Sequence, residues 1–484
     1  MTAELPETAG QVLVASNRGP VSYTRSADDG SLTAKRGGGG LVSGLSALGA
    51  DAGTWVCAAL SEDDRAAARA FDGRPPAADT GGQSVRMLDI PSETFDAAYN
   101  GIANSVLWFV HHLLYQTPLE PIFDAEFEAR WEHYRAYNLA FADALAEEAA
   151  EGAAVLVQDY HLALVPGLLA ERRPDLRIGH FSHTPWAPPE LFRVLPDPVA
   201  REVLLGVLGA DRAAFLTRRW ADAFIACCAA LLGAETTPDS VTHEGRTTRI
   251  GVHGLGADAA FLRDRAGRPD VDERLAELRE RVGPGRATIV RVDRTELSKN
   301  IVRGLLAYRR LLTDHPEWRG RVAHIAFAYP SRQDLALYRA YTAEVSRVAD
   351  AVNEEFGEDG WTPVILHVKD DFARSLAAYR MADVALVNPI RDGMNLVAKE
   401  VPVVSENGCA LVLSREAGAA EELGPDALLV NPYDIAGTAQ ALHEALSLDQ
   451  ATRAARSRRL ANTATALPPT AWFLAQLTAL RTTA

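Results

Sequence analysis

The sequence is poor in cysteine, and the spacing of the few cysteines excludes several kinds of site. Only four occur among 484 residues, with no CxxC pair and no Cys/His spacing typical of a zinc site. No basic and apolar targeting segment opens the sequence, and no run of about 18 uninterrupted apolar residues occurs. We therefore expect a reduced, cytoplasmic protein with no membrane partner.

Positive charge is also scarce. Lysine and arginine total 49 against 64 aspartate and glutamate residues, a formal net charge of −15. Nucleic acids and anionic membranes need a basic footprint, so both are excluded as partners. A small anionic substrate held by a few arginines stays compatible with this balance. The dinucleotide fingerprint GxGxxG and the phosphate loop GxxxxGK[ST] are both absent.

Short β-branched runs alternate with longer helical patterns rich in alanine, leucine and arginine. This alternation is typical of βαβ units and a parallel sheet. Eight strands could close into one barrel, but their uneven spacing favours two open, doubly wound sheets. The expected strands cover residues 11–16, 153–158, 177–182, 287–292, 322–327, 363–368, 382–387 and 409–414.

The chain is too long for one average domain, so two domains are expected. We predict an N-terminal Rossmann-like domain over 1–250, a C-terminal one over 251–465, and a C-terminal helix over 466–484 that packs back on the first domain. The polar stretch 236–249 and the segment 258–286 separate the two series. Ligands of such sheets bind beyond the carboxyl ends of the strands. Two facing domains would therefore enclose a cleft.

Polar residues follow the strands of the first series. Arg18 comes after the first strand, and four glycines at 37–40 precede an apolar helical pattern that could bind an anion at its N-terminus. Asp159 and His183 end two neighbouring strands, where they could meet around sugar hydroxyls. Each feature has another interpretation. The glycines could form a flexible loop, Asp159 could cap its helix, and His183 could be a core histidine.

Cations follow the strands of the second series. Arg294 and Lys299 could converge on a pyrophosphate without a metal, unless this loop is solvated and paired with Glu296. Arg332 follows the next strand. The stretch NPIRDGMNLVAKE at 388–400 then places Asp392 in a loop before a helix, and Glu400 one turn along that helix could hold a ribose.

Ten motifs, in order along the chain, resemble the trehalose-6-phosphate synthase family, and RDGMNLVAKE is the most specific of them. They are SNR at 16–18, GGL at 39–41, YNxxxNxxLW at 99–108, QDYHL at 158–162, HTPWxxxExF at 183–192, RxxxxSK at 294–299, PSR at 330–332, GWTP at 360–363, RDGMNLVAKE at 391–400 and NPYD at 431–434.

This resemblance implies an α/β fold of the GT-B type, with two Rossmann-like domains facing a cleft. It also implies a retaining glycosyltransferase that moves glucose from a nucleoside-diphosphate glucose to glucose 6-phosphate, giving α,α-trehalose 6-phosphate. No required metal is implied. A homo-oligomer is expected.

The resemblance also assigns roles to residues that match the family motifs. Catalysis would fall to Asp159, His183, Arg294, Lys299 and Asp392. The donor would be held by Gly39, Gly40, Arg294, Lys299, Asp392, Met394, Asn395, Leu396, Val397 and Glu400. We add Asp371 to the donor residues on the chemistry of its side chain and not on the resemblance. The acceptor would be held by Arg18, Tyr99, Trp108, Asp159 and Arg332.

Departures from the family pattern keep alternatives open. The family segment RLDYSKG reads RTELSKN here, and HTPWAPP and the pair Trp108-Phe109 also differ. A glucosylglycerol-phosphate synthase, a pseudo-glycosyltransferase that couples cyclitol phosphates and a catalytically silent sugar-phosphate sensor therefore compete with the leading interpretation.

The donor base is the finest expectation. The resemblance favours UDP-glucose, but Asp371 stands where the family often has an aromatic residue. Its carboxylate could accept two hydrogen bonds from guanine, so we slightly favour GDP-glucose. The alternative is that Asp370 and Asp371 simply cap the helix that follows.

Overall fold

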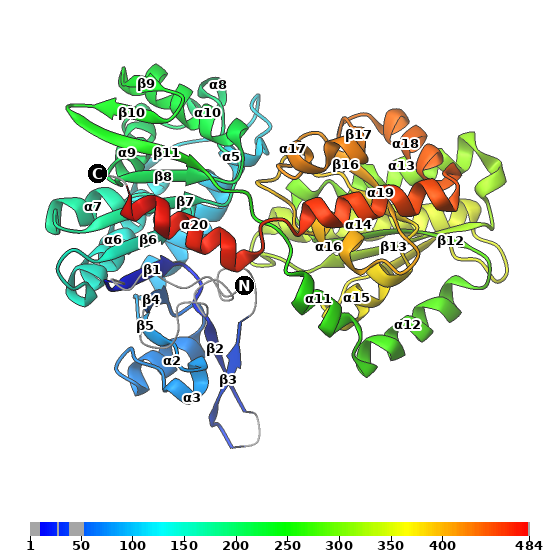
Figure 1. Cartoon of the computed structure of the whole chain (residues 1–484), viewed down its shortest axis with the longest axis horizontal. Coiled ribbons are helices and arrows are strands. Elements are labelled where there is room, and N and C mark those ends of the chain that lie inside the picture. The colour runs from blue at the N-terminus through cyan, green and yellow to red at the C-terminus, as the bar shows by residue number, and fades with distance from the viewer. Residues whose placement is uncertain (1–9, 27–28, 38–52, 483–484) are drawn as a thin grey trace. The chain divides into compact units, whose positions relative to one another are not determined.

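The computed structural model describes residues 10–26, 29–37 and 53–482. Its chain divides into two compact units: unit 1 comprises Met1–Leu255 with Pro469–Ala484, and unit 2 comprises Gly256–Pro468 (Figure 1). The C-terminal segment thus belongs to the same unit as the first half of the chain. Each unit is built around its own mainly parallel sheet.

Unit 1 contains a nine-stranded sheet of order β5-β4-β1-β6-β7-β8-β11-β10-β9. All neighbours are parallel except for the last two pairs, which are antiparallel. Outside the sheet, β2 (Val21–Arg25) and β3 (Leu32–Arg36) form a hairpin. The sheet strands are β1 (Val12–Ser16), β4 (Gly53–Ala58), β5 (Ser84–Leu88), β6 (Ala154–Gln158), β7 (Arg177–Ser182), β8 (Arg212–Phe215), β9 (Glu235–Thr237), β10 (Ser240–His243) and β11 (Arg246–Val252).

Helices connect these parallel strands, and two segments are π-helical, at Ala97–Leu107 and Cys228–Leu232. The α-helices described in unit 1 are α2 (Glu62–Ala70), α3 (Ala77–Thr80), α4 (Ser92–Asp96), α5 (Trp108–His112), α6 (Ala125–Glu148), α7 (Val165–Arg172), α8 (Pro189–Phe192), α9 (Asp197–Leu208), α10 (Arg218–Cys227) and α20 (Pro469–Arg481).

Unit 2 contains a six-stranded parallel sheet of order β14-β13-β12-β15-β16-β17. This order is that of a doubly wound Rossmann sheet, which grows outward in both directions from its first strand. The strands are β12 (Ala287–Arg294), β13 (Val322–Tyr329), β14 (Val364–His367), β15 (Val384–Val387), β16 (Ala410–Ser414) and β17 (Leu428–Val430).

The helices of unit 2 include α13, whose apolar residues recur every three or four positions and form one buried face. They are α11 (Ala259–Ala266), α12 (Pro269–Val282), α13 (Ile301–Asp314), α14 (Ala336–Phe356), α15 (Phe372–Met381), α16 (Val397–Val404), α17 (Ala420–Leu423), α18 (Ile435–Ser447) and α19 (Gln450–Ala464).

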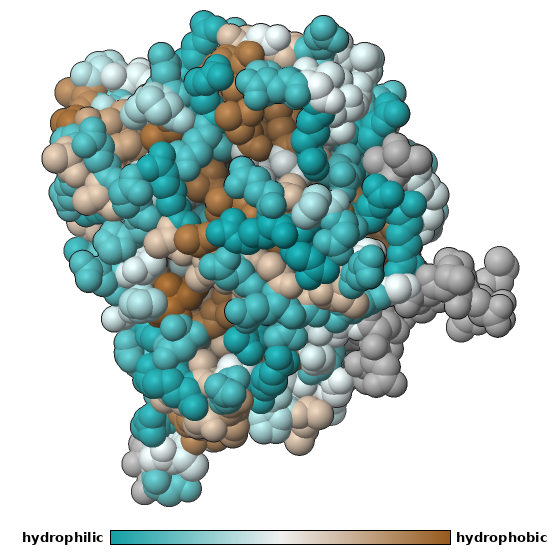
Figure 2. All heavy atoms as spheres, turned by 90° about the vertical axis from the view of Figure 1, so that its left-hand side faces the viewer, coloured by the Kyte–Doolittle hydropathy of each residue, from teal (hydrophilic) through white to brown (hydrophobic). Residues whose placement is uncertain are grey.

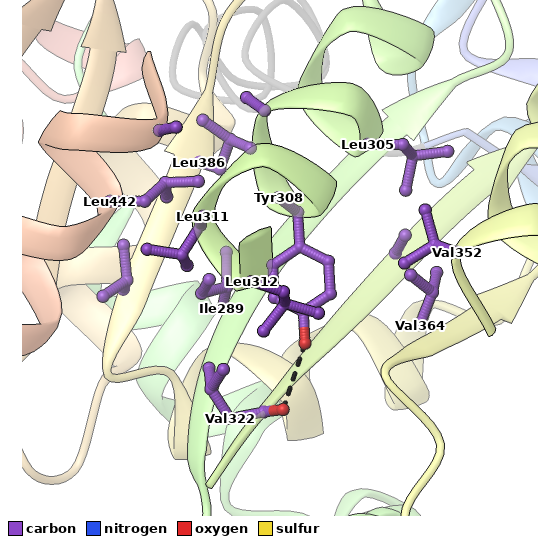
Figure 3. Close-up of a cluster of buried hydrophobic side chains, with 14 of the residues drawn as sticks. Ile289, Leu305, Tyr308, Leu311, Leu312, Val322, Val352, Val364, Leu386 and Leu442 are labelled. Atoms are coloured by element: carbon purple, nitrogen blue, oxygen red, sulfur yellow. Dashed lines mark hydrogen bonds between the residues drawn. The ribbon is translucent and has the colours of Figure 1, made fainter. Parts of the chain in front are cut away.

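The core of unit 2 lies where α13 packs on the sheet. Leu305, Tyr308 and Leu311 of α13 are fully buried against strand residues such as Ile289 and Val322 (Figure 3). The Tyr308 hydroxyl donates to the Val322 carbonyl at 3.0 Å, which satisfies the one polar atom of this side chain. Burying each such side chain contributes about 1.5–3 kcal/mol.

The eight expected strands are present as β1, β6, β7 and β12 to β16, with ends that differ by a few residues. The prediction that the polar stretch 236–249 separates the two series was wrong. This stretch forms β9 to β11 at the edge of the unit 1 sheet. Thr247 is exposed and Thr248 is buried in β11, as in a strand with one solvated face. Among the residues described, no helix is both long and apolar enough to cross a membrane.

One outer face of unit 1 carries hydrophobic patches between hydrophilic side chains (Figure 2). A groove of about 910 Å³ between α6, α7 and α9 is lined by leucines such as Leu139, Leu168 and Leu205, with charged residues at its rim. None of the expected site residues lines this groove.

Candidate active site

Both sheets have a topological switch point, where connections leave the first strand in opposite directions. In unit 1 it lies at β1, between β4 and β6, and in unit 2 at β12, between β13 and β15. Crevices at such points are where open α/β sheets bind ligands. Most of the expected site residues lie at the ends of β1, β6 and β7 in unit 1, and of β12, β13 and β15 in unit 2. The exceptions among the described residues are Tyr99 and Trp108, which follow β5, and Asp371, which follows β14.

Arg18 lies just beyond β1 with an exposed side chain. The Ser16 hydroxyl donates to the Arg18 carbonyl at 2.7 Å and fixes the backbone of this turn. A cavity of about 280 Å³ is lined by Arg18 together with Ser22, Tyr23 and Ser61. Leu60 and Asp64 line this cavity as well, and the Arg18 guanidinium is the one cation among the lining residues described that is suited to an anionic group.

Asp159 and His183 lie side by side, because β6 and β7 are adjacent parallel strands. The Asp159 carboxylate accepts from the His183 backbone N–H at 3.1 Å. Asp159 makes no side-chain cap to the turn that follows, so the capping interpretation is wrong for this residue. Its φ of 73° is left-handed, a strained geometry typical of functional sites.

His183 carries its proton on Nε2, since this atom donates to the Gln158 amide oxygen at 2.9 Å. Its ring packs 4.8 Å from Phe181 and 5.5 Å from Trp472 of α20, measured between centroids. Burial, with a smaller contribution from His180, lowers the pKa of His183 to about 4. The imidazole is therefore neutral near pH 7 and suited to hydrogen bonds with uncharged hydroxyls.

Tyr99 and Trp108 belong to the π-helical segment Ala97–Leu107 and to the α-helix that continues it. The Tyr99 ring stacks on His161 at 5.5 Å, and Trp108 lies 5.8 Å from Tyr160. Both contacts tie these aromatic rings to the residues that follow Asp159. π-helical turns are frequent at functional sites because they re-aim side chains.

Lys299 and Asp392 form an ion pair in unit 2, with Nζ 2.5 Å from Oδ2. Each side chain is only 15% exposed. Asn395 also donates to this carboxylate oxygen at 3.2 Å. Burial lowers the pKa of Lys299, but attraction by Asp392, Asp293 and Glu296 together outweighs it and the pKa ends above its usual value, so the lysine stays charged.

Arg294 pairs with Glu296 at 3.1 Å, as the solvated-loop alternative anticipated, but Glu296 is fully buried and not solvated. Arg332 reaches the other oxygen of the same carboxylate at 3.4 Å. Arg332 has φ of 48°, again in the left-handed region. The two arginines expected to bind different substrates therefore share one anion.

The segment after β15 turns sharply before α16. Asn395 has φ of 73°, and its side-chain oxygen accepts from the Ala398 N–H at 3.2 Å, so it holds the start of the helix. Met394, Leu396 and Val397 lie in this same turn. Glu400 accepts from the Tyr379 hydroxyl at 3.3 Å, and burial raises its pKa.

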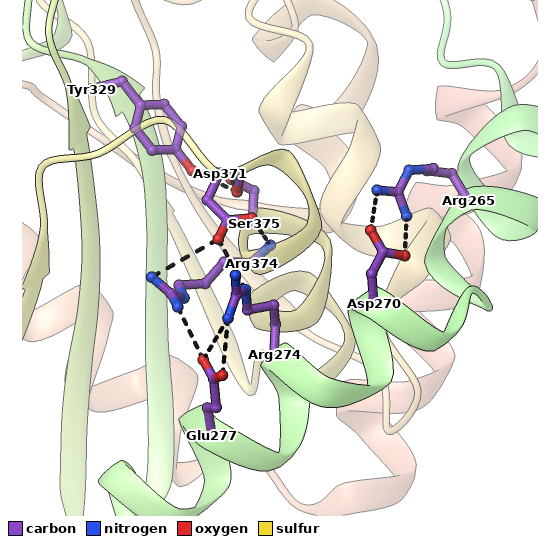
Figure 4. A network of polar contacts seen from close by, with 8 residues as sticks. All are labelled: Arg265, Asp270, Arg274, Glu277, Tyr329, Asp371, Arg374 and Ser375. Carbon is purple, nitrogen blue, oxygen red and sulfur yellow. Dashed lines mark hydrogen bonds and ion pairs between the residues drawn. The ribbon is translucent and has the colours of Figure 1, made fainter.

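Asp371 is the N-cap of α15, because its carboxylate accepts from the Arg374 N–H at 2.9 Å. The other carboxylate oxygen pairs with Arg274 of α12 at 3.0 Å (Figure 4). The interpretation as a helix cap is thus confirmed. The argument that this carboxylate reads guanine loses its basis, since both oxygens already have partners in unit 2.

Gly39 and Gly40, expected to meet the donor phosphates, lie outside the described residues. Among the residues that are described, one group offers three metal-ligating side chains: His315, Glu317 and His443. The two imidazoles stack in parallel at 3.7 Å, and Trp318 donates to His443 Nδ1. Parallel rings direct their in-plane lone pairs alongside each other, so this group is a poor metal site.

Several supporting residues were not expected from the sequence. Arg291 is fully buried, and it pairs with Asp293 at 2.7 Å and donates to the Lys299 carbonyl at 3.0 Å, which supports the loop that carries this lysine. Trp472 reaches His183 from a helix near the end of the chain. A charged residue inside an apolar strand was the available signal for Arg291, whereas nothing local signalled Trp472.

The chain is of the GT-B class, whose members are built from two Rossmann-like domains. Residues 10–482 match the model of glycosyltransferase family 20. The chain belongs to this family and is a glycosyltransferase.

Two further kinds of similarity agree. The chain is 35% identical over 466 residues to the α,α-trehalose-phosphate synthase (UDP-forming) 2 of Aspergillus fumigatus, covering 93% of this chain and 92% of that protein. It resembles the solved structure "Trehalose-6-phosphate from E. coli bound with UDP-2-fluoro glucose", with 28% identity, a TM-score of 0.84 and coverage of 98% and 99%. A UDP-forming synthase from Burkholderia xenovorans in complex with glucose-6-phosphate is 26% identical with a TM-score of 0.82, and 98% of this chain and 100% of that one are covered.

Proposed function

We propose that this protein transfers glucose from UDP-glucose to glucose 6-phosphate, forming α,α-trehalose 6-phosphate and UDP with retention of configuration. The observation that carries this proposal is the buried pair of Lys299 and Asp392 at the switch point of unit 2. A fixed cation there can neutralise a diphosphate, and the adjacent carboxylate can accept from sugar hydroxyls.

Unit 2 binds the donor in this proposal. Arg294 and Lys299 neutralise the diphosphate, and the exposed part of the Arg294 fork, 56% of the side chain, is available to its oxygens. Asp392 and the backbone of residues 394–397 hold the glucose, and Glu400 takes the ribose diol. Gly39 and Gly40 would add backbone N–H groups to the phosphates.

Unit 1 binds the acceptor. Arg18 binds its phosphate, Arg332 is the one acceptor residue of this proposal that belongs to unit 2, and Tyr99 and Trp108 line the sugar. Asp159 and the unprotonated Nδ1 of neutral His183 accept hydrogen bonds from hydroxyls near the reacting carbon, in keeping with their hydrogen-bonded positions at the ends of β6 and β7.

The chemical step is a front-face substitution. The bond from the anomeric carbon to the diphosphate oxygen breaks while the bond to the acceptor hydroxyl oxygen forms on the same face, and the departing phosphate oxygen takes the hydroxyl proton. Lys299 and Arg294 stabilise the negative charge that develops on the leaving group. No side chain is assigned as a covalent nucleophile.

UDP-glucose replaces GDP-glucose as the favoured donor. The guanine argument depended on a carboxylate that could accept two hydrogen bonds, and Asp371 instead caps α15 and pairs with Arg274. Similar proteins carry UDP-forming names, which also conflict with a GDP preference.

The deciding experiment incubates the full chain with UDP-glucose or GDP-glucose and with glucose 6-phosphate or free glucose. We expect UDP release together with a non-reducing disaccharide phosphate. Product with glycerol 3-phosphate instead would favour glucosylglycerol-phosphate synthase, and coupling of a cyclitol phosphate would favour the pseudo-glycosyltransferase. Substrate binding without any turnover would favour the silent sensor.

A further inference from the structure

Glu296 has a position that its place in a loop does not explain. It lies two residues beyond the end of β12 and its side chain is 0% exposed, yet Arg294 and Arg332 both lie within ion-pair distance of it. A buried carboxylate is costly unless its charge is compensated. The residues around it should therefore reveal what it is for.

The two oxygens of Glu296 have different partners. Oε1 lies 3.1 Å from Arg294 Nη1 and accepts from the Ser331 hydroxyl at 3.0 Å. Oε2 lies 3.4 Å from Arg332 Nη1, and the same Arg332 nitrogen donates to the Tyr338 hydroxyl at 2.9 Å. The carboxylate thus bridges two guanidinium groups that come from the ends of adjacent strands, β12 and β13.

The bridge is charged and geometrically constrained. Burial alone would raise the pKa of Glu296, but attraction by Arg294, Arg332 and Lys299 outweighs it, so the pKa lies below its usual value. The Arg332 backbone adopts a left-handed φ, and its guanidinium lies over the Tyr338 ring at 5.5 Å. Arg332 is held from two sides, whereas most of the Arg294 side chain remains exposed.

From this geometry we infer that Glu296 is a positioning residue that holds the donor-binding Arg294 and the acceptor-binding Arg332 at once, and so couples the two substrate sites. This inference rests on the proposed function, which assigns the two arginines to different substrates. When one arginine turns from Glu296 to an incoming phosphate, the carboxylate is left to the other arginine. Occupancy of one site therefore changes how firmly the second arginine is held.

The first test measures binding of UDP and of glucose 6-phosphate to the full chain by calorimetry. Glu296→Gln keeps the shape and removes the charge, so we expect both affinities to fall about 10-fold. Glu296→Asp keeps the charge and should stay within about 3-fold of the wild type. Glu344→Gln removes an exposed pairing with Arg347 on α14 of the same unit and serves as the matched control, with both affinities unchanged.

The single variant of a second test does not depend on the folding of Glu296→Gln. Arg332→Ala removes an acceptor-site cation only, yet it leaves Glu296 paired with Arg294 alone, so UDP affinity should fall about 3-fold. In a Glu296→Gln background the same change should leave UDP affinity as it is. An unchanged UDP affinity in Arg332→Ala would overturn the coupling.

The remaining outcomes are also decisive. A loss of only one affinity in Glu296→Gln, or a lower melting temperature with both affinities intact, would reduce Glu296 to a partner of one arginine or to a structural ion pair. Product formation by the wild type in either case leaves the proposed function standing. If the wild type binds neither UDP nor glucose 6-phosphate, the proposed function fails and the coupling fails with it.

Discussion

The two units present similar strand ends but hold their polar side chains in different ways. In unit 1, Asp159 and His183 are fixed by hydrogen bonds to a backbone N–H and to a neutral amide, with aromatic rings around them. In unit 2, Lys299 and Arg294 are fixed by carboxylates. One switch point is organised by neutral contacts and the other by ion pairs.

This difference has an energetic consequence. A typical neutral hydrogen bond contributes about 1 kcal/mol, whereas removing one partner of a buried ion pair costs about 3–5 kcal/mol because the other charge stays uncompensated. Substitutions at the switch point of unit 2 should therefore be the more damaging. The ion pairs also make unit 2 suited to a charged leaving group, and the neutral hydrogen bonds make unit 1 suited to uncharged hydroxyls.

The largest expected effect tests the charged side of this comparison. Lys299→Ala removes the diphosphate cation and leaves Asp392 without its lysine, so kcat/KM should fall about 1000-fold, or about 4 kcal/mol. Initial rates of UDP release measure it, and Lys35→Ala on the exposed hairpin strand β3 is the control. Retention of a third or more of the wild-type rate would contradict the role of Lys299.

Arg18 tests the unit 1 side, where the single expected cation lies in the open. Arg18→Ala should raise the KM for glucose 6-phosphate about 100-fold, equivalent to about 2.7 kcal/mol, with little change in the donor KM. The control is Arg25→Ala. Arg25 is a half-exposed residue of β2 that pairs with Asp63 of α2, and its removal should change neither constant. Equal turnover of free glucose and glucose 6-phosphate by the wild type would sink this assignment.

Acid should weaken the core of unit 2 through His324. This side chain is fully buried in β13, and burial, with a smaller contribution from Arg291, lowers its pKa from 6.5 to about 3. The unfolded chain therefore gains a proton below pH 6.5 while the folded chain does not, and stability falls as the pH drops. Between pH 6.5 and 5 the free energy of unfolding should decrease by about 2 kcal/mol from this residue.

Urea unfolding at pH 7 and pH 5 measures the loss, and His324→Asn should make it smaller. An identical pH dependence in this variant would show that His324 is not the source. The same sign applies to His180 and His183, since burial lowers the pKa of each to about 4.

Asp371 gives a smaller effect on stability and none on specificity. Asp371→Ala removes the cap of α15 and should cost about 1 kcal/mol, while the ratio of kcat/KM for UDP-glucose over GDP-glucose stays constant. Asp370→Ala, at the exposed neighbouring position, is the control. A change in the donor ratio confined to Asp371→Ala would restore the guanine interpretation.

Chelation should have the smallest effect of all. Arg294 and Lys299 already supply the positive charge that a divalent ion would bring to a diphosphate. Activity should therefore survive dialysis against EDTA. Complete loss, with rescue by magnesium or manganese, would show that the phosphate site has been misread.

Sequence patterns were sufficient for the central strands because these are continuous apolar runs, as in β1 and β6. The polar edge strands β9 to β11 were missed because solvent-facing threonines and arginines look like a loop when their pairing is unknown. β8 was also missed, because its four residues, an arginine, two alanines and a phenylalanine, include none of the β-branched side chains that marked the other strands.

The site was foreseeable to the same degree. Polar residues directly after apolar runs identify strand ends, which is how Asp159, His183 and Lys299 could be selected. The burial of Glu296 was not foreseeable, because a glutamate among charged neighbours looks solvated until its two arginines are placed. The role of Asp371 was misjudged for a different reason. An aspartate at this position could either cap the helix or bind a base, and the sequence does not distinguish the two roles.

The return of α20 to unit 1 also has a consequence for how the chain is made. On the ribosome, β7 emerges well before α20, and all of unit 2 is synthesised between them. The ring contacts of Trp472 with Phe181 and His183 therefore form only after α20 has been synthesised. A nascent chain that ends at Pro468 would carry a complete unit 2 but a first unit still missing one wall, so translation must finish before both sheets are covered.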